Sequence, residues 1–248
     1  MNIVSRLLFS LWLAILPPAV LAQPASSQAK SPLPTADAVR KSLDDLGSRS
    51  LPEAERNALK QVLEQTLAHL KAAEESANRL QRLKQTLDEA PGQAAQARAE
   101  LERIKAGAAP SLPAGLADRS LAELEKLFEE RSARLADWQK ALADANSQVI
   151  AAQTRPERGS EETIAGESRA KALADALRTG REANRTLTPE RRDLLAAEAE
   201  AIESRLRLLR QELAGNSVLL ELHQSRRDLL AERIAREERV IQALQESI

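Results

Sequence analysis

Apolar residues recur at steps of three and four along most of the chain, and this spacing places them on one face of an α-helix. The first stripe predicts a short helix from about Ala36 to Leu46. Thr35 has the side chain of an N-cap, and Gly47 can end the helix in a left-handed conformation.

A proline-glycine pair separates the next two stripes. Ser50 and Glu53 have the spacing of a capping box and predict the start of a long helix. We expect this helix to end near Glu89, because Pro91-Gly92 follows. A shorter apolar face comes after the pair and consists of Ala94, Ala97, Leu101 and Ile104. A loop over 107–117 is expected to follow.

The most regular heptads of the chain begin at a second capping box, formed by Ser120 and Glu123. They predict a coiled-coil helix roughly 50 Å long. Pro156 marks its expected end. The next stretch, up to residue 179, is predicted to be helical but weakly specified, because Gly159 and Gly166 each cost about 1 kcal/mol relative to alanine. The heptad seam comprises Leu121, Leu124, Phe128, Arg131, Leu135, Trp138, Leu142, Ala145, Val149 and Ala152.

Two more stripes complete the pattern. Thr188-Pro189 is an N-cap followed by proline at the first helical position, and it predicts a helix to about Ala214. Gly215-Asn216 is expected to close this helix and open the last one, whose seam reaches Ile248 without a polar cap. We interpret that end as cut out of a longer helix, or as docking onto something beyond it. The last seam comprises Leu220, His223, Arg227, Leu230, Ile234, Glu237, Ile241, Leu244 and Ile248.

These patterns predict an all-α protein without a sheet, built from long antiparallel coiled-coil helices as an elongated helical bundle. Aromatic residues make up 2% of the chain, which argues against a β-sandwich or barrel. A hydrophobic fraction of 43% and balanced charge, 36 basic against 37 acidic residues, argue against disorder throughout. The same balance disfavours nucleic acid as a partner, and the absence of cysteine excludes disulfides and thiolate metal sites.

The first residues have the pattern of a secretory signal peptide. Basic Arg6 precedes the apolar run Leu7–Leu16, and small residues lead up to Ala22. The run is shorter than the roughly 20 residues that a spanning helix needs. We therefore expect a signal peptide over 1–22, a flexible linker over 23–34 and a periplasmic coiled-coil helical domain over 35–248. A retained membrane anchor is the alternative.

The side chains that carry chemistry do not form the pattern of a catalytic, cofactor or metal site. His69 and His223 lack a neighbouring ligand motif, so neither is expected to bind a metal. Phe128 and Trp138 share one heptad seam, where core packing is expected. Asn184-Arg185-Thr186 matches a glycosylation sequon, which we interpret as coincidental in a chain with a bacterial export signal.

Two pairs of adjacent acids, Glu129-Glu130 and Glu161-Glu162, invite comparison with glycoside hydrolysis. That chemistry needs two carboxylates opposed across a cleft, whereas adjacent residues on a helix form a solvated face. We therefore predict no catalytic residue, no cofactor-binding residue, no metal ligand and no cofactor, and we do not expect an enzyme.

Short motifs in a fixed order link the chain to a known family. The motifs are Gln153–Arg158, Leu187–Pro189, Leu213–Leu219 and Gln224–Asp228, and Ala90-Pro91 is a further match. In this order and spacing the chain resembles the periplasmic N-terminal porin domain of MscK-type mechanosensitive channels of the MscS superfamily, over about residues 36–248.

The resemblance implies an inner-membrane channel that opens under membrane tension and releases solutes during hypo-osmotic shock. This sequence shows no run that corresponds to the family's pore, so no pore residue is transferred and we expect a truncated or split channel subunit. The implied partners are a membrane-embedded channel portion or another envelope protein, with a homo-oligomer as a further option and no small-molecule substrate evident. The alternative is a free-standing periplasmic coiled-coil adaptor or chaperone-like protein.

Overall fold

A computed structural model describes residues 33–107 and 120–247. The expected signal peptide, most of the expected linker and loop, and Ile248 lie outside the described residues. The described part is an all-α elongated helical bundle, as the apolar spacing predicts, with one small hairpin in addition. Its elements are α1 (Ala36–Asp44), the 3-10 helix η1 (Asp45–Ser48), α2 (Glu53–Ala106), α3 (Leu121–Thr179), β1 (Arg181–Glu182), β2 (Arg185–Thr186) and α4 (Pro189–Gln245).

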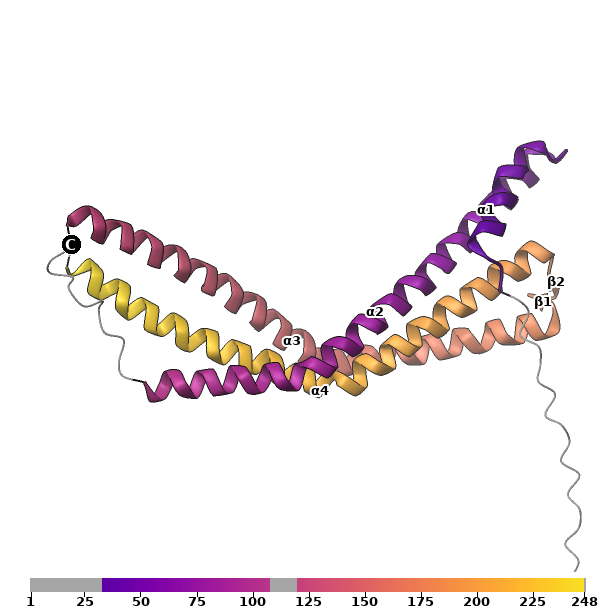
Figure 1. Cartoon of the computed structure of the whole chain (residues 1–248). Helices are drawn as coiled ribbons and strands as arrows, with labels where there is room; N and C mark the ends of the chain where they lie inside the picture. Colours follow the sequence, from indigo (N-terminus) through magenta and orange to yellow (C-terminus); the bar gives the residue numbers. More distant parts are fainter. Residues whose placement is uncertain (1–32, 108–119, 248) are drawn as a thin grey trace, which may run out of the picture. The chain divides into compact units, whose positions relative to one another are not determined.

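Helix α4 is the one against which the other two long helices pack. Its contacts with α2 and with α3 are the most extensive in the described chain, and Figure 1 shows it running beside both. Helix α2 follows α4 in the same direction. Leu63 and Asp193 line one cleft at the N-terminal side of this interface, and Glu100 pairs with Arg233 towards the C-terminal side.

Helix α3 lies antiparallel to α4 along the length of both. Arg169 pairs with Glu198 at 2.7 Å close to the hairpin that joins the two helices. Arg131 pairs with Glu237 at 3.0 Å at the other end. Consecutive long helices therefore alternate in direction, as a chain of antiparallel neighbours requires.

The core of the bundle is arranged around α4, which contacts α2 on one side and α3 on the other. Neighbouring residues on a helix point about 100° apart, so a helix with one partner rarely buries both. In α4 the pairs Leu194-Leu195, Leu208-Leu209 and Val240-Ile241 are buried at both positions. One member of each pair can thus face α2 while the other faces α3.

Proline does not end the helices where the sequence predicts it. Helices α2 and α3 continue through Pro91 and Pro156, so the predicted ends near Glu89 and at Pro156 are wrong. Proline removes one backbone donor and costs about 3 kcal/mol inside a helix. Both prolines lie on the exposed side, while Ala90 and Ala94 beside Pro91 are buried against α4. Burial of the opposite face outweighs the local cost.

The predicted helix break at Gly215-Asn216 is also wrong, because α4 is continuous there. Glycine instead allows two helices to approach each other closely. A Cβ atom at Gly215 would lie 2.5 Å from both methyl groups of Leu87 on α2. Gly159 and Gly166 of α3 face Leu213 and Leu206 of α4, with Cβ distances of 2.7 and 2.9 Å. The helix after Pro156, expected to be weakly specified, is positioned by these leucine-on-glycine contacts.

Three of the predicted helix starts are confirmed. The Thr35 hydroxyl accepts a hydrogen bond from the Ala38 amide at 3.2 Å. The Thr188 hydroxyl accepts one from the Arg191 amide at the same distance. At Ser120, the Glu123 carboxylate accepts the backbone N–H and the hydroxyl, each at 2.9 Å. Each cap satisfies a donor that the helix itself leaves unpaired.

The predicted capping box at Ser50 and the predicted left-handed helix end at Gly47 are wrong. Helix α2 starts at Glu53 with Pro52 in the N-cap position, and the Ser50 side chain makes no cap. Gly47 is not left-handed, because α1 tightens into η1, in which the Ser48 hydroxyl donates to the Asp45 carbonyl at 2.7 Å. Tightening the last turn satisfies carbonyl groups without a left-handed residue.

The expectation of no sheet is wrong in the connection between α3 and α4. Strands β1 and β2 pair antiparallel around Ala183 and Asn184, whose φ angles are 44° and 64°. A two-residue turn with both φ values positive matches the twist of the paired strands. Glu182 of β1 accepts two hydrogen bonds from Arg191, at 2.7 and 2.9 Å, and so ties the hairpin to the first turn of α4.

The close contact at Gly215 predicts opposite effects for two glycine-to-alanine substitutions. Alanine gains about 1 kcal/mol over glycine within a helix, and Gly92, where nothing lies within 4 Å of an added methyl group, should show that gain. At Gly215 the methyl group would meet Leu87, and overpacking costs roughly 1–3 kcal/mol. We expect Gly215→Ala to lower and Gly92→Ala to raise the free energy of unfolding in urea. Stabilisation by both would show that α2 does not pack closely on α4.

Candidate functional site

Side chains from α2, α3 and α4 meet around the middle of α4. Leu87 of α2 packs on Gly215, and Ala90 and Ala94 of α2 pack on Leu222. From the other side, the Asn216 side-chain amide donates to the Ala152 carbonyl of α3 at 2.9 Å. We call this region the central junction.

An ion-pair network across α3 and α4 adjoins the central junction. Arg155 donates from Nε to Glu212 at 2.9 Å, and also from Nη2 to the same carboxylate. Its Nη1 donates to Glu162 at 2.9 Å, and Arg205 donates to the other oxygen of Glu162 at 2.8 Å. Two arginines and two carboxylates thus alternate, and we call them the Arg155 network.

The network favours the charged state of Arg155 and of Glu162. Partial burial acts to lower the pKa of Arg155, but the hydrogen bonds from Glu212 and Glu162 outweigh it and the pKa is raised. The hydrogen bond from Arg155 is the main cause that lowers the pKa of Glu162, against a smaller effect of burial and with help from Arg205. Arg155 and Glu162 are therefore both ionised near neutral pH.

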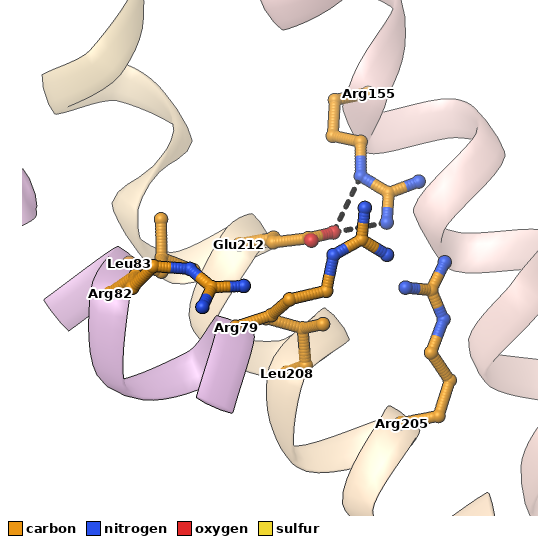
Figure 2. Close-up of a pocket in the computed structure, with 7 residues that line it drawn as sticks. All are labelled: Arg79, Arg82, Leu83, Arg155, Arg205, Leu208 and Glu212. Carbon is orange, nitrogen blue, oxygen red and sulfur yellow. Dashed lines mark hydrogen bonds and ion pairs between the residues drawn. The ribbon is translucent and has the colours of Figure 1, made fainter. Parts of the chain in front are cut away.

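A cleft of about 390 Å³ opens beside this network. Figure 2 shows the guanidinium groups of Arg79, Arg155 and Arg205 pointing toward one another across it. Arg82 lines the cleft one turn further along α2. With Glu212 as the only acidic lining residue among those described, the cleft is strongly positive. Its lining comprises Arg79, Arg82, Leu83, Arg155, Arg205, Leu208 and Glu212.

A second polar contact lies within the α3–α4 interface. Glu237 is 5% exposed, and its two oxygens accept hydrogen bonds from Nη1 of Arg131 at 3.0 and 3.2 Å. The Arg233 guanidinium lies 6.0 Å from the ring centre of Trp138. The pairing of Arg131 with Glu237 is not among the predictions from the sequence, although opposite charges on two heptad seams are a signal that could have found it.

The histidines and aromatics singled out from the sequence lie apart from the cleft. His69 is on α2 and His223 on α4, both half-buried. No group of three or more His, Asp or Glu side chains among the described residues could hold a metal ion. Phe128 and Trp138 are half-buried, so the expected core role holds only in part.

The acidic pairs separate into different environments. Glu129, Glu130 and Glu161 are exposed, as expected for a solvated face. Glu162 instead joins the Arg155 network, which sequence reasoning missed because its partners are 7 and 43 residues away along the chain. Asn184 of the sequon is exposed at the hairpin turn.

Comparison with known proteins gives two matches. The sequence model described as mechanosensitive ion channel porin domain matches residues 42–248. The mechanosensitive channel MscK of Escherichia coli (strain K12) is 27% identical over 225 residues, which is 90% of this chain and 20% of MscK. The chain thus spans about a fifth of the length of this curated relative. No solved structure matches the chain.

Removing Arg131 and removing Glu237 should lower the free energy of unfolding by unequal amounts. The Arg131 side chain is 25% exposed and can reach water, whereas the Glu237 side chain is 7% exposed and cannot. Arg131→Met leaves a buried charge unpaired and should cost about 3 kcal/mol. Glu237→Met should cost about 1 kcal/mol, and the double variant less than the sum of the two.

Urea unfolding of the four proteins of this cycle measures the coupling. The exposed pair of Lys126 and Glu130 is the control, since its side chains are 78% and 59% exposed. Glu130→Met should change the unfolding free energy by less than about 0.5 kcal/mol. Equal losses for Arg131→Met and Glu130→Met would contradict a structural role for the buried pair.

The surroundings of His223 predict that the free energy of unfolding depends on pH. Burial, with a smaller effect of nearby Arg226, lowers the pKa of His223 below 6.5, and its Nδ1 is buried without a hydrogen-bond partner. The unfolded chain therefore binds a proton at higher pH than the folded chain does, and stability falls as the pH drops through 6.5.

We expect His223→Gln to reduce the loss of unfolding free energy between about pH 7.5 and about pH 5.5, a range in which most carboxylates stay ionised. His69→Gln is the matched substitution, because it removes the other histidine. Identical pH profiles for His223→Gln and the parent protein would refute the prediction.

Proposed function

The chain belongs to the mechanosensitive ion channel porin domain family, and we propose that it acts as a non-catalytic periplasmic helical domain of a mechanosensitive channel in the response to osmotic shock. The observation that carries the proposal is the family match over residues 42–248, which includes all of α2, α3 and α4. The 27% identity to MscK over most of this chain supports the same assignment.

The pore, in this proposal, comes from a membrane-embedded part to which the domain is joined or docked. No helix in the described part of the chain is both long and apolar enough to cross a membrane. The matched relative is a channel of which this chain spans about a fifth. We propose a truncated or split channel subunit, with residues 1–22 as signal peptide, 23–34 as linker and 35–248 as a periplasmic coiled-coil domain at the inner membrane.

The length and packing of α4 support such a role. Helix α4 is continuous over 57 residues, a contour length of about 85 Å. Packing on α2 and α3 restrains it against bending, since adjacent residues are buried on two sides. A displacement at one end of α4 is therefore passed along the bundle, and we propose that this domain sets the membrane tension at which the channel opens.

No catalysis is included in the proposal. The family is defined by a channel domain, and the ionised side chains of the Arg155 network are engaged with one another across α3 and α4. The proposed partners are the membrane-embedded portion, other envelope proteins and further copies of the chain.

The test replaces the matching segment of MscK with residues 33–248 of this chain. The chimera and a channel that lacks the segment are expressed in Escherichia coli without other mechanosensitive channels, and tension thresholds are measured in membrane patches. We expect both to open, at different thresholds. We further expect Gly215→Leu, which forces α2 away from α4, to shift the threshold of the chimera towards that of the shortened channel.

Gly92→Ala is the control in the same chimera, because nothing lies within 4 Å of a Cβ at this position. It should keep the threshold of the unmodified chimera. Equal thresholds for the chimera and the shortened channel would speak against a role in gating and in favour of a free-standing envelope protein.

A further inference from the structure

The cleft beside the Arg155 network concentrates positive charge from three helices that are distant in sequence. Arg79 and Arg82 come from α2, Arg155 from α3 and Arg205 from α4. Counting Glu162 with Glu212, four guanidinium groups face two carboxylates, a local excess of two positive charges. Like charges repel at short range, so the arrangement is stabilised by any anion that enters.

The four arginines differ in how many donors remain free. Arg155 uses three of its five N–H groups on Glu212 and Glu162, and Arg205 uses one on Glu162. Arg79 and Arg82 make no side-chain hydrogen bond or ion pair to any described residue. Most donors available to a ligand therefore come from α2, and the Arg155 network positions the rest.

The lining of the cleft also suits an anion. Leu208 is 2% exposed and forms an apolar wall together with Leu83. Arg79 and Arg82 are exposed, so an anion here would be held mainly by charge and by guanidinium hydrogen bonds. The volume of about 390 Å³ has room for a phosphate-sized group with a substituent.

From the donors, the charge and the shape of this cleft, we propose that it is a binding site for a phosphoryl group, held by Arg79 and Arg82 of α2 with Arg155 and Arg205 opposite. Guanidinium groups match the tetrahedral oxygens of phosphate through paired N–H donors. A phosphoryl group also carries its acceptor oxygens in a tetrahedral arrangement, which opposed arginines can contact from both sides, unlike a planar carboxylate. The site goes beyond the proposed channel role and does not depend on it, and occupancy would draw α2 towards the α3–α4 hairpin.

The experiment measures binding to the purified full chain by calorimetry, with inorganic phosphate as the probe and acetate as the carboxylate comparison, at constant ionic strength. A second arm measures co-sedimentation with vesicles that contain phosphatidylglycerol, against vesicles of phosphatidylcholine alone. Binding of inorganic phosphate supports a soluble phosphate as ligand. Binding only to the phosphatidylglycerol vesicles supports a lipid headgroup at the same site.

The double variant Arg79→Gln/Arg82→Gln tests the site, and circular dichroism melting should show an intact fold because neither side chain has a partner among the described residues. The control Arg134→Gln/Arg239→Gln removes the same charge from exposed arginines outside the cleft. We expect at least about tenfold weaker binding for the first and no change for the second. Absence of binding in both arms, equal binding by the two variants, or acetate binding as tight as phosphate binding would overturn the proposal.

Discussion

The described fold depends on the burial of α4 from two sides. One partner helix can cover only one stripe of α4. The second residue of each adjacent buried pair would then be exposed to water, so α4 needs two partners. Helices α2 and α3 supply the two partners, and α2 in addition buries Leu63 against Val39 of α1. The same constraint explains why α2, α3 and α4 continue through residues that usually end helices. As long as the face toward the partner is buried, this burial outweighs the cost of about 3 kcal/mol at Pro91 or Pro156.

Charged side chains fix the axial alignment of the packed helices. Apolar stripes of alanine and leucine repeat so regularly that a shift by one heptad would bury much the same surface. Arg131 with Glu237, and the Arg155 network further along, each have one matching alignment, and a shift would leave charges without partners. The leucine-on-glycine contacts act in the same way, since a Cβ atom at Gly159, Gly166 or Gly215 would lie within 3.0 Å of the leucine that packs there.

Sequence reasoning could predict the fold class, the family and the helix starts at Thr35, Ser120 and Thr188, because these depend on local chemistry and on spacing. It was wrong at Glu89, at Pro156 and at Gly215, because a helix continues or ends there according to the burial of its far side, which involves another helix. The Arg155 network and the cleft beside it were not predictable for the same reason. Arg79, Arg155 and Arg205 are adjacent only after the helices have packed, and no local pattern distinguishes them from the many other arginines of the chain.

The limited contact between α2 and α3 makes the bundle separable. Helix α3 is joined to α4 by a two-stranded turn and packs on it with ion pairs, whereas α2 packs on α4 with core contacts and ion pairs of its own but is not joined to it by that turn. Local opening in proteins proceeds in such units, each with its own free energy. Backbone amides of α2 should therefore exchange with solvent through detachment of that helix while the hairpin stays closed. Unfolding then has two steps, and a force on α2 acts on the α2–α4 interface without crossing the α3–α4 hairpin.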